Sequence, residues 1–266
     1  MKIVVCIKEV LDPDMAASVF SVDEAAKKAA PLAARLVISP FDAQAIELAL
    51  RIRDTRGDVA ISLLSLGGES ARSIVKYGLS LGADEGVLLI DPALDDGDGY
   101  TTASALAAAI VRMGHADLIL TGRQAADDDA GVVGLGIAES LAIPAVTFAS
   151  DLTVEGSVLV VERTLPEGSE IVEVPMPALV TVSHEVGSVR HANLRETMKA
   201  ARKPVEVWSA AELGLDPAQV GARGARRVVE RLYVPVNDVA CEFIPGASPH
   251  EIASNLLERL SHAKLI

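Results

Sequence analysis

Short apolar runs alternate with longer amphipathic segments through the first half of the sequence. The runs are rich in Val, Ile and Leu without polar alternation, and they span residues 3–7, 59–65, 87–90 and 117–121. Strands buried on both faces of a parallel sheet have this pattern. Helical patterns lie between and after the runs, at residues 69–81, 101–113 and 132–141. Because such alternation builds a mostly parallel sheet covered by helices on both faces, the sequence predicts a doubly wound α/β fold.

A further helix is marked at its start by Ser39-Pro40-Phe41-Asp42. Serine is a favourable N-cap residue, proline suits the first helical position, and a carboxylate is common in the first turn. Ala45, Leu48, Ala49 and Ile52 then follow the i, i+3, i+4, i+7 spacing of one helix face. We therefore expect an amphipathic helix that begins at Pro40 and packs on the sheet.

After residue 146 the pattern changes to short strands joined by turns. Gly156-Ser157 separates the runs 152–155 and 158–163, a spacing that is typical of a β-hairpin. Further short strands are predicted at 171–174 and 178–183, and residues 194–203 have a helical pattern with a basic end.

Regularity is lost from residue 209 to about residue 246, as expected of an extended segment that lies on another surface. A last helix is marked by Ser248-Pro249-His250-Glu251, a capping box with proline at the first helical position. Its apolar face packs either on this chain's own sheet or on another protein, and it consists of Ile252, Leu256, Leu257 and Leu260.

The expected organisation is therefore one Rossmann-like, mostly parallel α/β domain and one arm. The domain covers residues 1–203, with 146–183 as a small β-rich addition and 184–203 as a loop and helix. The arm covers residues 204–266 and ends in the last helix.

Charge and composition exclude several classes of protein. The 24 basic and 37 acidic residues give a net charge of −13 over 266 residues, which disfavours a nucleic-acid partner because such binding depends on clustered Lys and Arg. Two cysteines, Cys6 and Cys241, make no disulfide framework and fit a reducing compartment. No apolar run is long enough to span a membrane, and no targeting segment is visible. We expect a soluble, cytoplasmic protein without membrane insertion.

The most unusual segment is the loop 122–134, which follows the strand 117–121 and leads into a helix. A small-residue turn in this position presents backbone N–H groups and a helix N-terminus, an arrangement that binds anions such as phosphate. The consecutive Asp127, Asp128 and Asp129 do not fit a simple phosphate loop, because carboxylates repel phosphate. They cap the helix, accept hydrogen bonds from a ribose, hold a cation, or form no more than an exposed acidic turn.

Two more turns follow predicted strands. Residues 65–70 (Ser-Leu-Gly-Gly-Glu-Ser) are weakly similar to the pyrophosphate loop of ATP pyrophosphatases, with Leu66 and Glu69 as departures. Residues 95–102 join a strand to a helix and contribute to a cluster of carboxylates over 84–139. An acidic rim of this kind suits a hydroxyl-rich ligand or a basic partner.

Several catalytic motifs are missing from the sequence. It contains no G-x-S-x-G elbow, no HExxH or CxxC spacing, no P-loop and no G-x-G-x-x-G after the first strand. The five histidines are scattered. We therefore expect a nucleotide-binding α/β protein without catalytic residues or a metal site of its own.

Taken together, the motifs resemble the β subunit of electron-transfer flavoprotein over nearly the whole chain. The matching segments are Val4-Val5-Cys6-Ile7-Lys8, Ser39-Pro40-Phe41-Asp42, Leu81-Gly82-Ala83-Asp84, residues 122–129 (GRQAADDD), Val161-Glu162-Arg163, Glu167-Gly168-Ser169-Glu170, residues 177–181 (PALVT), Arg190-His191-Ala192-Asn193-Leu194 and Met198-Lys199-Ala200.

The resemblance implies an electron carrier rather than an enzyme with its own catalytic residues. In that family the β subunit pairs with a larger α subunit that carries the redox FAD, and the heterodimer takes electrons from acyl-CoA or other flavin dehydrogenases and passes them to an acceptor. The arm 204–266 is then expected to dock on the α subunit. Partner recognition falls on Arg190, Leu194, Met198 and Lys199.

The resemblance also implies a nucleotide in the β subunit, either AMP or a second FAD as in the bifurcating branch. FAD is preferred, because Asp98, Thr102, Asp127, Asp129, Val133 and Gly134 are similar to that branch. The expected contacts are Cys6, Ser39, Pro40, Phe41, Asp42, Leu66, Asp98, Thr102, Gly122, Arg123, Gln124, Ala125, Asp127, Asp129, Ala130, Gly131, Val132, Val133 and Gly134. The alternative functions are a stand-alone adenine-nucleotide-binding module and a nucleotide hydrolase of the same fold.

Overall fold

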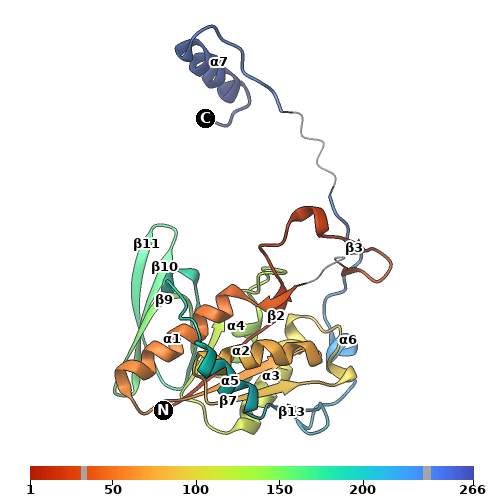
Figure 1. Cartoon of the computed structure of the whole chain (residues 1–266), viewed down its shortest axis with the longest axis vertical. Coiled ribbons are helices and arrows are strands. Elements are labelled where there is room, and N and C mark those ends of the chain that lie inside the picture. The colour runs from red at the N-terminus through yellow and green to blue at the C-terminus, as the bar shows by residue number, and fades with distance from the viewer. Residues whose placement is uncertain (31–34, 236–240) are drawn as a thin grey trace.

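A nine-stranded sheet, in the order β11-β10-β9-β12-β8-β1-β6-β7-β13, forms the centre of the computed structural model, which describes residues 1–30, 35–235 and 241–266. Neighbours from β9 to β13 in this order are parallel, whereas β10 and β11 are antiparallel. Helices cover both faces of the sheet (Figure 1). The structure thus confirms the predicted doubly wound, mostly parallel α/β fold.

The strands of the central sheet are β1 (Lys2–Cys6), β6 (Ala60–Leu66), β7 (Glu85–Leu89), β8 (Leu118–Gly122), β9 (Ala145–Glu155), β10 (Val158–Leu165), β11 (Gly168–Pro175), β12 (Ala178–Val182) and β13 (Glu206–Trp208). Two small sheets pair β2 (Glu9–Leu11) with β5 (Leu36–Ile38) and β3 (Val22–Asp23) with β4 (Lys28–Ala29). The helices are α1 (Pro40–Arg56), α2 (Arg72–Leu81), α3 (Gly99–Met113), α4 (Val133–Leu141), α5 (Leu194–Arg202), α6 (Gly221–Gly224) and α7 (Pro249–His262). Short 3-10 helices are η1 (Ala17–Val19), η2 (Glu69–Ala71), η3 (Pro92–Leu94) and η4 (His184–Val186).

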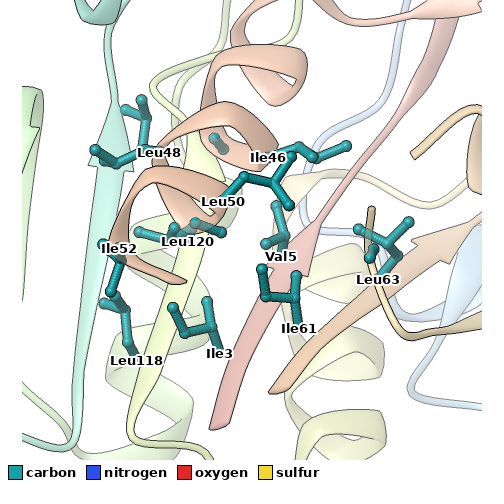
Figure 2. Close-up of a cluster of buried hydrophobic side chains, with 14 of the residues drawn as sticks. Ile3, Val5, Ile46, Leu48, Leu50, Ile52, Ile61, Leu63, Leu118 and Leu120 are labelled. Atoms are coloured by element: carbon teal, nitrogen blue, oxygen red, sulfur yellow. The ribbon is translucent and has the colours of Figure 1, made fainter. Parts of the chain in front are cut away.

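Strand β1 shows why its sequence is apolar from Ile3 to Cys6. Ile3 and Val5 pack in the cluster that includes α1 and α2, whereas Val4 and Cys6 pack in the cluster that includes α3 and α4. Figure 2 shows the first of these clusters, where side chains of α1 lie over β1, β6 and β8. Since both faces are buried from Ile3 to Cys6, these positions leave no room for a polar residue, whereas the partly exposed Lys2 can begin the strand.

The predicted strands and helices of the first 146 residues are confirmed, with ends that shift by at most two residues except at the start of the helix 69–81. There the first three residues form η2, and α2 begins at Arg72. The predicted hairpin is also confirmed, because Glu155 pairs with Val158 across Gly156-Ser157. The structure adds β13, which pairs with β7 at one edge of the sheet.

The first part of the C-terminal segment packs on the domain, and its last helix does not. Residues 206–208 form β13, and Ala210 and Val220 are buried in the core on the side of α3. Beyond this part, α7 stands away from the sheet in Figure 1 and has no buried residue. The predicted capping box is present, with the Glu251 amide donating to Ser248 Oγ at 3.2 Å. Packing of the last helix on its own sheet is therefore not observed.

Parts of the predicted domain and arm, residues 31–34 and 236–240, lie outside the described residues. None of the helices within the described ranges combines the length and the hydropathy needed to cross a membrane.

A matched pair of isoleucines tests the core. Ile61 is fully buried in β6, whereas Ile171 in the edge strand β11 is 70% exposed. We expect Ile61→Ala to lower the free energy of unfolding by about 2–5 kcal/mol, because it removes buried methyl groups and leaves a cavity. Ile171→Ala should cost less than about 1 kcal/mol. Urea unfolding measures both, and equal losses would contradict the assignment of the core.

Candidate functional site

The order of the strands reverses beside β1. The chain passes from β1 to β6 and β7 on one side and then returns to form β8 on the other side of β1. In open α/β sheets ligands bind outside the carboxyl ends of the strands at such a switch point. Cys6, Leu66 and Gly122 are the last residues of β1, β6 and β8. Three of the predicted contact residues therefore lie at the ends of the strands around the switch point.

Asp42 joins two of these strand ends from the first turn of α1. Its Oδ2 accepts a hydrogen bond from the Lys8 amide at 2.7 Å, and its Oδ1 accepts one from the Gly122 amide at 2.9 Å. A Cβ atom on Gly122 would lie 2.5 Å from Asp42 Oδ1 and 2.7 Å from Phe41 Cβ. Glycine is thus required at residue 122 for α1 to approach the end of β8 so closely.

Burial controls the titration of the two ionisable groups at this point. It raises the pKa of Asp42 to about 7, although the hydrogen bonds from the Lys8 and Gly122 amides lower it in part. Burial also raises the pKa of the Cys6 thiol, and the Asp42 carboxylate adds to this effect. Cys6 is therefore a neutral thiol at physiological pH, packed as a small apolar side chain.

The three aspartates after β8 are each paired close to the loop itself. Lys8 Nζ lies 2.7 Å from Asp127 Oδ2, Gln124 Nε2 donates to Asp129 Oδ1 at 2.8 Å, and the Ala130 amide donates to Asp128 at 3.3 Å. Among the residues described, no group of three His, Cys, Asp or Glu side chains is arranged as metal ligands. The aspartates thus fix the shape of the loop that leads to α4.

The N-terminus of α4 lies against the ends of β8 and β12. A Cβ atom on Gly134 would lie 2.6 Å from Thr121 Oγ1 and 3.2 Å from Thr181 Cγ2, so this approach depends on glycine. Val132 occupies the N-cap position, and within the described chain no side chain caps this helix start. The first amides of α4 are therefore available to an anion, as the sequence predicts.

Arg123 crosses the site between two aromatic rings. Its guanidinium carbon lies 5.0 Å from the ring centroid of Phe41 and 5.7 Å from that of Phe148. One terminal nitrogen donates to Ser183 Oγ at 3.4 Å. Phe148 has a φ of 61° in β9, a backbone conformation that is a strained outlier for an aromatic residue.

Three buried polar atoms at these strand ends lack hydrogen-bond partners among the described residues. They are Ser39 Oγ, Ser65 Oγ and Arg123 Nε. Ser39 and Ser65 are fully buried, and a buried polar atom without a partner is costly. Two hydroxyls and a cation without internal partners are groups of the kind that bind a nucleotide.

Two other predicted contacts lie on α3. Thr102 is in its first turn, and the start of α3 adjoins α4, since a Cβ on Gly99 would lie 2.5 Å from Val132 Cγ2. Asp98 caps α3 by accepting hydrogen bonds from the Tyr100 and Thr101 amides at 3.1 and 3.0 Å. Its second oxygen accepts hydrogen bonds from two amides of the C-terminal segment. The carboxylate of Asp98 is therefore already saturated with donors from this chain.

Of the residues predicted to recognise a partner, Arg190 packs on this chain's own helix α1. Its Nε donates to Glu47 Oε2 at 2.9 Å and one terminal nitrogen donates to Asp54 at 2.8 Å. Arg51 Nε also donates to Glu47, at 2.9 Å. Burial alone would raise the pKa of Glu47, but the hydrogen bonds from Arg190 and Arg51 outweigh it and lower that pKa. Arg190 thus fastens the loop before α5.

The other three recognition residues lie on α5. Leu194 and Met198 are 76% and 55% exposed and one turn apart, and Lys199 is also exposed. Asn193 caps the helix by accepting from the Glu196 amide at 2.9 Å. Lys76 of α2 donates to the carbonyl of Ala200 at 3.2 Å near the other end. The helix is held at both ends while its apolar side chains face solvent.

The structure adds residues that were not in the predicted set. Ser65 is the penultimate residue of β6, which is shifted by one residue from the predicted strand 59–65, and Phe148 lies at an irregularity in the pairing of β9. His184 follows β12 and its ring lies edge-on to Phe41 at 6.3 Å. Only Ser65 had a signal in the sequence, namely its place in a Gly-rich turn after a strand.

The pH dependence of stability tests Asp42. Because the folded-state pKa of about 7 lies above the usual value of 3.8, the folded chain binds more protons than the unfolded chain between these values. Stability contributed by Asp42 is then lost as the pH rises from about 4 to about 7. From pH 5 to pH 7.5, wild type should lose roughly 2–3 kcal/mol relative to Asp42→Asn in urea unfolding. A difference that does not change with pH would contradict the buried carboxylate.

Comparison with known proteins matches the electron transfer flavoprotein domain to residues 29–213. The chain is 36% identical to the electron transfer flavoprotein subunit beta of Megasphaera elsdenii and 31% identical to the caffeyl-CoA reductase-Etf complex subunit CarD of Acetobacterium woodii, in each case over 100% of both chains. It is 34% identical to protein FixA of Rhizobium meliloti, over 89% of this chain and 82% of that protein. These findings confirm the resemblance drawn from the sequence. The chain belongs to the electron transfer flavoprotein family.

Proposed function

We propose that this chain is the β subunit of a heterodimeric electron transfer flavoprotein, which accepts electrons from flavin dehydrogenases and passes them to a redox acceptor. The observation that carries the proposal is the convergence of residues 39–42 and the loop after β8 at the switch point, in a chain with full-length relatives in the family. Flavin supplies the electron chemistry in such a protein, and the polypeptide supplies binding and position.

The proposed ligand of the strand ends is an adenine nucleotide. Its phosphate would be held by the free amides of α4 and by Arg123, and the hydroxyls of Ser39 and Ser65 would supply partners within the buried part of the site. Cys6, Leu66 and Gly134 would be apolar or small contacts. Asp98 is left out of this set because its oxygens already accept four amides.

The proposed partner surfaces are α5 and the end of the arm. Burial of one exposed leucine such as Leu194 is worth about 1.5–3 kcal/mol, which suits a contact that must form and release. The arm offers an apolar face at Ile252, Leu256 and Leu257, which are 40%, 44% and 61% exposed. This face would dock on the α subunit.

A nucleotide hydrolase is disfavoured by the turn that follows β6. Ser70 Oγ donates to Glu9 at 2.5 Å, and the Gly67 amide donates to the Leu89 carbonyl at 3.2 Å. These groups therefore form hydrogen bonds within the chain and are not available to a phosphate.

The finer proposal is FAD rather than AMP in this chain, on the resemblance to the bifurcating branch. Nucleotides released from the purified heterodimer by acid are separated by HPLC, and two FAD per heterodimer are expected. One FAD and one AMP would overturn the FAD assignment but keep the adenine site. No adenine nucleotide beyond the FAD of the α subunit would overturn the site itself.

Deletion of residues 235–266 tests the arm. The described part of the truncated segment makes its hydrogen bonds within itself, so the domain should keep its urea midpoint. We expect association with the α subunit to weaken at least tenfold, measured by size-exclusion chromatography and calorimetry. An unchanged heterodimer would show that the arm has no docking role.

A further inference from the structure

Two aspartates after β7 each divide their carboxylate between a local helix and the C-terminal segment. Asp91 accepts the Ala93 amide of η3 at 2.9 Å with Oδ1 and the Ala210 amide at 3.0 Å with Oδ2. Asp98 caps α3 with Oδ1, and its Oδ2 accepts the amides of Arg226 at 2.7 Å and Arg227 at 3.0 Å. The loop 91–98 thus holds the C-terminal segment at two points some 16 residues apart in the chain.

The attachment at Asp98 is reinforced by contacts from two other elements. The Arg226 guanidinium lies 3.4 Å from the ring centroid of Tyr100 in α3. Lys27, in the turn between β3 and β4, donates to the Val229 carbonyl at 2.8 Å. The adjoining strand β4 is tied to the loop after β7, since Lys28 Nζ lies 2.6 Å from Asp96. Residues 226–229 are therefore gripped from α3 and from the β3–β4 turn.

Beyond this grip the chain leaves the domain (Figure 1). From Val228 onward the segment carries several exposed apolar side chains, which are Val228 81%, Val229 56%, Tyr233 51%, Val234 50% and Phe243 88% exposed. A segment of this composition is adapted to contact with another surface. The segment departs from the domain after Val229, the last residue held by these contacts.

We infer that Asp98 is a clasp that fixes the point where the C-terminal arm leaves the domain, and so positions the arm for the partner subunit. The clasp stands on the contacts within this chain, and the positioning of the arm rests on the proposed function. Fixing the base of a docking segment reduces the conformational freedom that is lost on binding. Burial would raise the pKa of Asp98, but the amides of Thr101, Arg226 and Arg227 outweigh it and lower that pKa, which keeps the carboxylate ionised.

Asp98→Asn in the full-length chain separates the clasp from the cap of α3. The amide oxygen can keep the hydrogen bonds of Tyr100 and Thr101, while the NH2 group then faces two N–H donors. Trypsin cleaves after Arg226 and Arg227, and Arg231 lies beyond the clasp as an internal reference. We expect cleavage at Arg226 and Arg227, relative to Arg231 and followed by mass spectrometry, to rise at least fivefold.

Asp216→Asn is the matched control, because Asp216 accepts the Ala218 amide in its own turn of the same segment. It should leave the cleavage ratio unchanged. Asp98→Ser, which keeps a helix-capping oxygen on a shorter side chain, should raise the ratio as Asp98→Asn does. An unchanged ratio in both Asp98 variants would overturn the clasp.

The positioning role has its own measurement. Asp98→Asn should slow association with the purified α subunit at least threefold, whereas Asp216→Asn should not. Raised cleavage with an unchanged association rate would overturn the positioning role and leave the clasp. Loss of bound nucleotide without raised cleavage would assign Asp98 to the ligand instead. Wild-type chain that binds no α subunit would overturn the proposed function, and the proteolysis result would still decide the clasp.

Discussion

The buried carboxylate of Asp42 joins the ends of β1 and β8, the two strands on either side of the switch point. The strand order reverses between β1 and β8. The Lys8 and Gly122 amides, at the ends of these two strands, donate to Asp42. The Asp42 carboxylate at the start of α1 accepts a hydrogen bond from each of these amides. The close approach of α1 to Gly122, the conformation of the loop that follows and the position of Arg123 all depend on this bridge. Burial of the charged carboxylate is unfavourable, and this raises the pKa of Asp42.

Helix α1 connects the candidate site to the segment that leads into α5. Gln44 Nε2 donates to the Gly187 carbonyl at 2.7 Å, Glu47 holds Arg190, and Arg51 donates to the Val186 carbonyl at 2.8 Å. These three side chains lie along one stripe of the helix. The segment after β12 is thus fastened turn by turn to the same helix whose first residues form the site. A displacement of α1 would move both surfaces together.

How much the sequence predicts depends on the range of the interactions involved. The strands of the sheet are readable because burial on both faces requires unbroken apolar runs, as in β1 and β6. The helix starts at Pro40 and Pro249 are readable because proline favours the first helical position. Ser248 also caps its helix as predicted, whereas Ser39 Oγ makes no capping hydrogen bond. Edge strand β13 has three residues, and its pairing with β7 is set by distant groups, so its sequence carries no comparable signal.

The site shows the same division. The loop after β8 is recognisable as a strand-to-helix turn, but the partner of Asp127, Lys8, comes from another segment. Asp98 and Arg190 were both expected to face outward, toward a cofactor and a protein partner. Each instead binds groups more than a hundred residues away in its own chain. Charged side chains in motifs of this kind are ambiguous in sequence, because the same ion serves a ligand or an internal contact.

The internal pairing of Arg190 changes which side chains the segment 190–199 exposes to solvent. With Arg190 paired to Glu47 and Asp54, the exposed part of the segment proposed for partner recognition consists mainly of Leu194 and Met198 rather than its arginine. Apolar contact is not directional, and its strength follows the area buried. Selection among partners by such a surface then depends on shape and on the charges around it, such as Lys199. An apolar anchor on a helix whose position is already fixed loses little conformational freedom on contact, so that a small buried area suffices for binding.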